Sequence, residues 1–396
     1  MYSQSVSFLL CLLCFAVPIS AARAVSSEDR RDKQQQDSSS VSANLDDTCS
    51  SSIEHSRNQW HQIVQGDSLQ VLQGERAHDL FGWSVSLSQD GTTLAVGAID
   101  NDTNGSASGQ VRLYKIHNNN DGHNNSKSVQ VSPLGDPIDG LDPGDYHGYA
   151  VDLSEDGSIV AMGAPDHQQS AGMVRVYRYV NITATWMQLG ESLLGDAPGD
   201  GFGHILALSN TGDVLVVGAP YYKQNTGLVR IFQFNHHDHS WNGLGQDLVG
   251  DTDGAQFGYS VAVSKDGNIL VVGSKNHPYY YHKTARVGQV RTFQRIEGQW
   301  KPITKPLYGM HSRDYFGFAL SLSASGAMLV VGNPYFDTFK GKDAGKVQVY
   351  QRVRHIAEVA EEDAEATCTR SQQSESYEWR KVGQDIPGEA TNDYFG

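Results

Sequence analysis

Apolar and polar residues alternate in a block of eighteen residues that recurs five times along the chain. The copies occupy 81–98, 147–164, 202–219, 257–274 and 316–333. In the first copy, FGWSVSLSQDGTTLAVGA, the apolar residues Trp83, Val85 and Leu87 alternate with serines, which is typical of a β-strand. A second apolar run follows a turn that glycine closes in every copy. Each block therefore predicts a β-hairpin.

Two further strands are expected after each hairpin. The third begins at a glycine, as in GQVRLY at 109–114. The fourth begins at a tryptophan in four repeats (Trp186, Trp241, Trp300 and Trp379). Val131 takes that place in the segment that leads into the second block. A recurring unit of four antiparallel strands is typical of a propeller blade. The sequence therefore predicts an all-β fold, a β-propeller of four-stranded antiparallel blades with five blades visible.

The last residues repeat the start of a block. Asp393-Tyr394-Phe395-Gly396 matches the approach to the FG pair, so it predicts the start of a sixth blade. A ring that is not closed leaves sheet edges exposed, which invites aggregation. We therefore expect the chain to be truncated, with an open ring and an exposed edge near residues 379–396.

The repeats resemble FG-GAP repeats, as found in the N-terminal β-propeller of integrin α chains, in the variant with a short SxDG turn. Phe81-Gly82 supplies the FG pair, and Gly163-Ala164-Pro165 and Gly218-Ala219-Pro220 supply GAP. The resemblance covers residues 60–396. It implies a rigid extracellular scaffold whose loops recognise ligands.

Flanking segments point to export. Residues 1–24 contain a short apolar stretch and the small-residue motif Ala22-Arg23-Ala24, which together predict a secretory signal peptide. Residues 25–59 are rich in Ser, Gln and Asp and predict a disordered linker. The propeller then spans 60–396, with an acidic insertion at 353–378. The formal net charge of −15 argues against a nucleic-acid partner.

Two kinds of covalent modification fit an oxidising compartment. Four sequons predict glycosylation, at Asn101, Asn104, Asn124 and Asn181. Cys49 and Cys368 remain after removal of the signal peptide and either pair with each other or have partners elsewhere.

Metal binding is not expected. The resemblance implies calcium in the hairpin turn, but here that turn has shrunk to one aspartate at most, too few ligands for a hard cation. Asp100, Asp102 and Asn104 form a weak alternative calcium loop that lacks a closing carboxylate. The histidines at 236–239 are interpreted as a solvated turn. We therefore expect no metal and no cofactor.

Two features recur before and after the block. An aspartate precedes FG at the same offset in every approach except the fourth, which has Ala255, and is expected to accept backbone N–H groups or to join a shared ligand site. The loops after GAP carry aromatic residues in three blades, which would either bind ligand or pack on the next blade. These residues are Tyr221, Tyr222, Tyr279, Tyr280, Tyr281, Tyr335 and Phe336.

The sequence carries no catalytic motif that we recognise, so an enzyme is not expected. It favours a secreted or cell-surface binding or adhesion module that recognises an extracellular protein or carbohydrate through loops on one face. The alternatives are an extracellular propeller hydrolase or lyase and a structural matrix or cell-wall protein. A membrane anchor stays undetermined, because the C-terminus is expected to be missing.

Overall fold

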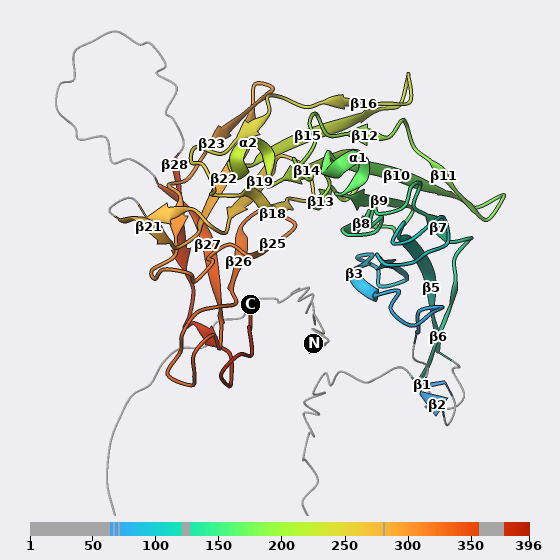
Figure 1. The fold of residues 1–396 in the computed structure, drawn as a ribbon, viewed down its shortest axis with the longest axis horizontal. Coiled ribbons are helices and arrows are strands. Elements are labelled where there is room, and N and C mark those ends of the chain that lie inside the picture. The colour runs from blue at the N-terminus through green and yellow to red at the C-terminus, as the bar shows by residue number, and fades with distance from the viewer. Residues whose placement is uncertain (1–63, 66–67, 70–71, 121–126, 280–281, 356–375) are drawn as a thin grey trace, which may run out of the picture.

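The computed structural model describes residues 64–65, 68–69, 72–120, 127–279, 282–355 and 376–396. Five antiparallel sheets follow one another along the chain and lie side by side in an arc (Figure 1). Each sheet has the order first, second, third and fourth strand, and a short fifth strand pairs with the start of the third. These sheets are the blades of the predicted propeller, and the fold class is confirmed.

The strands have the following bounds. Blade 1 contains β3 (Phe81–Leu87), β4 (Thr93–Ala98), β5 (Gln110–Asn120), β6 (Lys127–Pro133) and β7 (Ile138–Asp139). Blade 2 contains β8 (Val151–Leu153), β9 (Ile159–Ala164), β10 (Met173–Val180), β11 (Thr185–Gln188) and β12 (Leu193–Leu194). Blade 3 contains β13 (Ile205–Leu208), β14 (Val214–Ala219), β15 (Leu228–Asn235), β16 (Ser240–Gly243) and β17 (Leu248–Val249).

The remaining elements complete the arc. Blade 4 contains β18 (Phe257–Val263), β19 (Ile269–Ser274), β22 (Gln289–Ile296), β23 (Gln299–Pro302) and β24 (Leu307–Tyr308). Blade 5 contains β25 (Ala319–Leu322), β26 (Met328–Asn333), β27 (Lys346–His355), β28 (Ser376–Lys381) and β29 (Ile386–Pro387). Two small hairpins lie outside the blades, β1 (Val64–Gln65) with β2 (Ser68–Leu69) and β20 (Pro278–Tyr279) with β21 (His282–Arg286).

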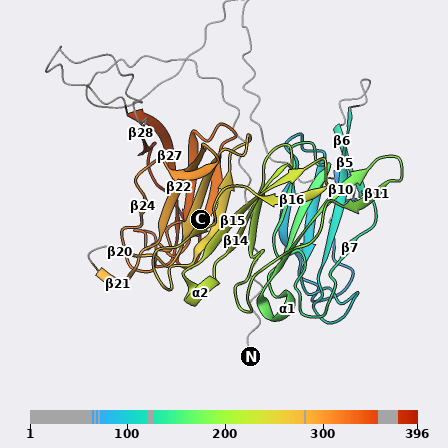
Figure 2. The same ribbon diagram turned by 90° about the horizontal axis from the view of Figure 1, so that it is seen from above.

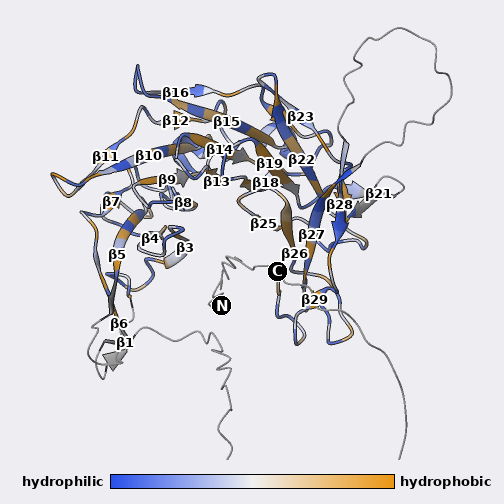
Figure 3. Cartoon of the chain, turned by 180° about the vertical axis from the view of Figure 1, so that it is seen from behind, coloured by the Kyte–Doolittle hydropathy of each residue, from blue (hydrophilic) through white to orange (hydrophobic). Residues whose placement is uncertain are grey.

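The apolar core lies between consecutive blades. The second strand of blades 2, 3 and 4 is buried along its whole length, because both faces of the sheet are covered. Each of four apolar clusters joins residues of one blade to residues of the next, such as Val174 of blade 2 with Leu215 of blade 3. Apolar residues run along β14 and β19, whereas β16 at the outer edge is polar (Figure 3). A single repeat therefore cannot bury its apolar surface without its neighbour.

The FG and GAP motifs meet across the blade interface. A Cβ on Gly218, the glycine of GAP in blade 3, would collide with the carbonyl group of Gly258, the glycine of FG in blade 4. The same contact recurs between Gly97 and Gly148 of the first two blades. Glycine is therefore required at the GAP position by the close approach of two backbones.

Loops divide the propeller into two faces. The hairpin turns between first and second strands lie on one face, here called the turn face. The loops after GAP and the loops before FG lie on the other, here called the GAP face. The short helices α1 (His167–Ser170) and α2 (Tyr222–Asn225) belong to the GAP face and lie far from the C-terminal end of β5 (Figure 2).

The arc is open between blade 1 and blade 5 (Figures 1 and 3). Phe395 forms a parallel bridge with Gly345, as the first residue of each FG-type pair does with the preceding blade in the other repeats. The C-terminal residues therefore occupy the place where a blade begins. Among the described residues, no helix is long and apolar enough to cross a membrane.

Candidate ligand-binding face

Five aromatic rings form a continuous belt along the inside of the arc, and each comes from the residue that follows the FG-type pair. We call Trp83, Tyr149, His204, Tyr259 and Phe318 the aromatic belt. The centroids of successive rings lie 5.5, 4.9, 5.1 and 5.1 Å apart, with tilted planes. Such spacing gives favourable ring contacts. The belt therefore couples all five blades through one side chain each.

The backbone explains how these rings leave the regular ladder. In blade 4 the pairing of β18 with β19 shifts register between Phe257 and Ser260, so Tyr259 is not paired. In blade 3 the first strand starts at Ile205, directly after His204. A bulge or late strand start re-aims the side chain at this position. The residue after FG therefore turns toward its counterparts in the neighbouring blades.

His204 lies at the centre of the belt. Its Nε2 atom lies 3.4 Å from the hydroxyl of Tyr149 and 3.5 Å from that of Tyr221. The side chain is 8% exposed. Burial, with a smaller contribution from the charge of Lys275, lowers the pKa of His204 to about 4. His204 is therefore neutral at physiological pH, and its buried Nδ1 has no hydrogen-bond partner in the described structure.

Lys275 supplies a positive charge next to the belt. It occupies the position at which three other blades carry the proline of GAP, Pro165, Pro220 and Pro334. Its Nζ atom lies 3.5 Å from the centroid of the Tyr259 ring and 5.6 Å from that of Phe318. Such contacts stabilise an ammonium group over an aromatic face. Burial nevertheless lowers the pKa of Lys275 to about 8, because the charged form loses hydration.

A pocket of about 750 Å³ opens between blades 4 and 5 on the GAP face. Its aromatic residues are Tyr315, Phe318 and Tyr335. Its charged residues are Lys275, Arg286, Arg313, Lys342, Asp314, Asp337 and Asp343. The volume falls in the range of small-ligand sites. The pocket thus combines ring faces with both charge signs.

The aspartate before FG accepts a backbone N–H group of its own turn, which is one of the two roles expected from the sequence. Asp145 accepts the backbone N–H of Asp142 at 3.1 Å, and Asp200 accepts that of Ala197 at 3.2 Å. The equivalent bonds from Arg76 to Asp79, from His311 to Asp314 and from Ala390 to Asp393 are also present. These carboxylates hold the loops that lead into FG on the GAP face.

Residues 73–114 match the family model of the FG-GAP repeat. The chain contains an FG-GAP repeat, and its five sheets fit an FG-GAP β-propeller. No match was found among curated proteins. The recognition of the repeat from its FG, SxDG and GAP residues is confirmed.

The aromatic candidates of the FG-GAP loops divide into two groups. Tyr335 lines the pocket and is 39% exposed, and Tyr221 is 37% exposed with its ring 5.5 Å from that of His204. Tyr222 packs instead on the core between blades 2 and 3. Phe336 lies between the ring of His311 and the ammonium group of Lys346. Tyr222 and Phe336 thus take part in packing within the protein while staying partly exposed, and ligand contact stays a prediction for both.

Three aromatic candidates cannot be assigned to either group. Tyr280 and Tyr281 lie outside the described residues, as does the side chain of Tyr279. The aromatic belt itself was missed from the sequence. An aromatic residue follows the FG-type pair in all five copies, which was the available signal.

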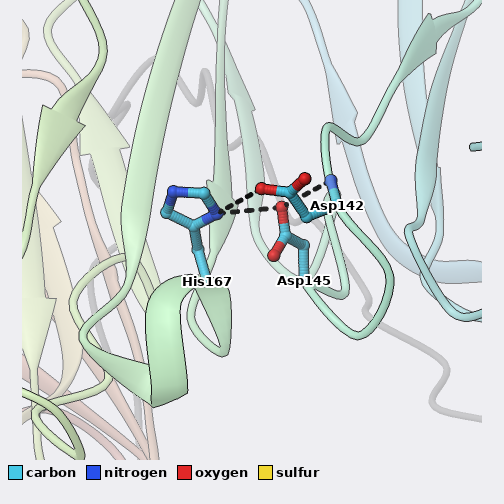
Figure 4. Close-up of side chains that lie close together, drawn as sticks. All are labelled: Asp142, Asp145 and His167. Carbon is cyan, nitrogen blue, oxygen red and sulfur yellow. Dashed lines mark hydrogen bonds and ion pairs between the residues drawn. The ribbon is translucent and has the colours of Figure 1, made fainter.

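The side chains of Asp142, Asp145 and His167 form the one group of potential metal ligands in the described part of the chain (Figure 4). The Nδ1 atom of His167 lies 3.0 Å from Asp145 and 4.0 Å from Asp142. Blade 1 has an equivalent contact, 3.3 Å from the amide of Asn101 to Asp79. Asp145 and His167 of blade 2 therefore occupy the positions of Asp79 and Asn101 in blade 1, and their contact belongs to the turn before FG.

The weak calcium-loop candidates use their side chains within the fold. Asp102 accepts the N–H of Ala107 at 2.9 Å, and the amide of Asn104 donates to the carbonyl of Gly140 at 2.8 Å. Burial, followed by the charges of Asp102 and Asp79, raises the pKa of Asp100.

The modification sites fall in different environments. Asn101 is 2% exposed and bonds Asp79, so the prediction of a glycan at Asn101 conflicts with the folded structure. Asn104 and Asn181 are exposed and stay predictions. Asn124 lies outside the described residues. The same holds for the signal peptide, the linker, most of the acidic insertion, and Cys49 and Cys368.

Proposed function

We propose that this FG-GAP propeller is secreted or displayed at the cell surface and binds an extracellular protein or carbohydrate through its GAP face. The observation that carries the proposal is the pocket between blades 4 and 5, where Tyr315, Phe318 and Tyr335 meet charged loop residues. Convergent polar groups around aromatic surfaces are the usual composition of a ligand site. The blades serve as a rigid scaffold that positions the loops.

The repeat supports a propeller-type module, commonly a ligand-binding one. Fold alone does not give function, so the argument rests on the pocket. Within the described residues we find no nucleophile paired with a base and an orienting group. A binding role therefore fits the site better than a hydrolase, a lyase or a purely structural protein.

The test starts from the full chain recovered from the medium of expressing cells, with its N-terminus sequenced. We expect the mature protein to start near Val25. Glycan arrays and pull-down screening then identify ligands. Recovery only as an intracellular protein with an intact Met1 would contradict export.

The affinity of any ligand so found is measured for Tyr335→Ala and for Ile182→Ala. Tyr335 lines the pocket, whereas Ile182 is 97% exposed in the turn between β10 and β11. Truncation of an aromatic hot spot costs about tenfold or more in affinity. We expect such a loss for Tyr335→Ala alone. Equal affinities for both variants and the unmodified protein would reject the pocket as the binding site.

A further inference from the structure

Four basic side chains gather in the pocket without a balancing partner. We call Lys275, Arg286, Arg313 and Lys342 the cation cluster. Within the described residues, none of the four forms an ion pair. This is unusual on a chain whose formal net charge is −15. Cations left unpaired in a shared cavity create a local positive potential that attracts an anion.

The carboxylates of the same pocket have other hydrogen bonds. Asp314 is 3% exposed and accepts the backbone N–H of His311 at 2.9 Å. Asp337 accepts the backbone N–H of Asp343 at 2.9 Å. These bonds hold the loops of blade 5. Asp314 and Asp337 therefore shape the pocket, and with Asp343 the pocket holds three carboxylates against the four cations, which leaves one positive charge in excess.

Two members of the cluster depart from the pattern of the repeat. Lys275 replaces the proline of GAP. Arg313 has φ = 71° at a position where blades 2, 3 and 4 carry glycine, whereas His78 and Asn392 share this positive φ at the same offset before the other FG pairs. The positive φ therefore belongs to the turn that precedes FG. What blade 5 adds at this position is a guanidinium group that lines the pocket.

A backbone contact joins two of the cations. The N–H of Arg313 donates a 2.7 Å hydrogen bond to the carbonyl oxygen of Arg286. This bond links the loop before FG in blade 5 to the loop after GAP in blade 4. The two guanidinium-bearing residues therefore enter the pocket from neighbouring blades. Two neighbouring arginines suit carboxylate and sulfate groups, because their N–H donors can bond the oxygen atoms of a planar carboxylate or a tetrahedral sulfate.

We propose that this pocket binds an acidic carbohydrate, with a carboxylate or sulfate of the sugar held by Lys275, Arg286 and Arg313 and a sugar ring lying against Tyr315 and Tyr335. The proposal rests on the proposed function and names its ligand class. The rings of Tyr315 and Tyr335 lie 5.0 Å apart at 76°, and Tyr335 also contacts Tyr394 at 5.1 Å. Tyr335 is still 39% exposed, so part of its ring can meet the apolar face of a sugar.

The acidic residues of the pocket distinguish a sugar from an acidic peptide. Asp337 and Asp343 line the pocket together with the cation cluster, and their carboxylate oxygens can accept hydrogen bonds from neutral hydroxyl groups. A poly-glutamate peptide brings carboxylates but no hydroxyl groups, so it has no donors of this kind for these two acceptors. An acidic sugar carries hydroxyl groups beside its anionic groups and matches both parts of the pocket.

Four probes are titrated into the full-length secreted protein by calorimetry. They are an oligogalacturonate, a heparin hexasaccharide, the neutral sugar maltohexaose and a poly-glutamate peptide. The first carries carboxylates alone and the second also carries sulfates, so the two separate the sources of the anion. We expect at least one of them to bind, and maltohexaose and poly-glutamate to bind at least tenfold more weakly.

Variants then locate the site. Lys275→Met and Arg313→Gln each remove one charge-assisted contact and are expected to weaken binding about tenfold. Arg313→Gly gives the same loss of affinity without lowering the thermal midpoint, because glycine suits the positive φ. Lys301→Met is the matched control, since Lys301 lies on β23 at the outer edge of blade 4 and pairs with Glu297. It should bind as the unmodified protein does.

The outcomes separate the two proposals. If the acidic sugars bind Lys275→Met and Arg313→Gln as tightly as the unmodified protein, this pocket is not their binding site. Equal binding of maltohexaose, or tighter binding of poly-glutamate, would overturn the ligand class while leaving a ligand-binding face in place. Absence of binding by both acidic sugars would overturn the inference. The proposed function fails separately, if a ligand found by screening is indifferent to Tyr335→Ala.

Discussion

The indole N–H of Trp241 donates a 2.8 Å hydrogen bond to the carbonyl oxygen of Leu189, and this bond joins the outer edge of blade 3 to that of blade 2. Trp186 and Trp300 make the same bond to the preceding blade. A Cβ on Gly190 would lie 2.9 Å from the Trp241 ring, so glycine leaves room for the indole. The tryptophan that marks the fourth strand in the sequence is therefore a connector between blades.

We expect Trp241→Phe to lower the free energy of unfolding by about 1–3 kcal/mol, because the Leu189 carbonyl loses its donor and the interface loses part of a buried ring. Trp241 is 9% exposed. Urea denaturation followed by circular dichroism measures the change. Trp83→Phe is the control, since Trp83 is 41% exposed and phenylalanine keeps an aromatic ring in the belt. An equal loss in both variants would contradict the inter-blade role.

Gly218→Ala tests the contact between the GAP and FG motifs. The added Cβ would overlap the carbonyl of Gly258 and a methyl group of Ile205, so blades 3 and 4 would have to separate. We expect a loss of about 2 kcal/mol or more in the free energy of unfolding. Gly243→Ala is the matched control, because no atom lies within 4 Å of its added Cβ. Thermal unfolding of both variants should show a drop for Gly218→Ala alone.

The SxDG turns predict that chelation leaves stability unchanged. Asp266 accepts the hydroxyl of Ser264 at 2.6 Å and the N–H of Asn268 at 3.1 Å. Burial raises the pKa of Asp266, but these hydrogen bonds outweigh it and lower the pKa overall. A carboxylate held in this way stabilises its turn without a cation. The thermal midpoint with and without EDTA measures this.

A clear fall in the midpoint on chelation would contradict the prediction. Asp142, Asp145 and His167 would then be the first positions to test. His167→Gln should abolish the effect of EDTA if they hold the ion.

The architecture of this protein could be predicted from its sequence because each blade repeats the same local signals. The turn glycines lie in the hairpin turns and the tryptophans lie in the fourth strands, as their recurrence predicted. The aspartate before FG accepts backbone N–H groups, which was one of its two expected roles. The pocket could not be predicted, because it depends on single departures from the repeat. Lys275 and Arg313 are 38 positions apart in sequence numbering and meet only when blades 4 and 5 pack.

Aromatic residues at similar places in the repeat can also have different neighbours, and the sequence alone does not predict which. Tyr222 and Tyr335 are both aromatic residues in loops after GAP, yet the first packs on the core and the second lines the pocket. Which neighbour a loop ring meets is decided by the adjacent blade. The residues next to each tyrosine in the sequence do not identify the neighbour that its ring contacts.

His204 predicts how stability depends on pH. Its pKa is about 4 in the folded protein and is taken as 6.5 when unfolded, so the unfolded chain binds the proton more tightly. Above pH 6.5 His204 is neutral in both states and has little effect on the free energy of unfolding. As pH falls from 6.5 toward 4, the unfolded chain takes up the proton first, so the free energy of unfolding decreases. We expect unmodified protein to lose about 2 kcal/mol between pH 7 and pH 5 that His204→Phe does not lose.

Urea denaturation of both proteins at the two pH values gives the difference directly. His117→Phe is the control, because His117 is exposed on β5 and contacts Ser132. It should keep the pH dependence of the unmodified protein. A pH dependence that His204→Phe leaves unaltered would show that the belt tolerates a charged imidazole.

Lys275 predicts that binding of an acidic sugar weakens at alkaline pH. Its pKa of about 8 means that the free ammonium group is mostly charged at pH 7 and mostly neutral at pH 9. Over this range His204 stays neutral, because its pKa is about 4, and burial keeps Tyr259 neutral by raising its pKa. The affinity for oligogalacturonate should therefore fall about tenfold between pH 7 and pH 9. In Lys275→Arg the guanidinium group remains charged, so the affinity should stay nearly constant. Calorimetric titrations of both proteins at the two pH values decide the matter, and an equal fall in both would remove Lys275 from the binding site.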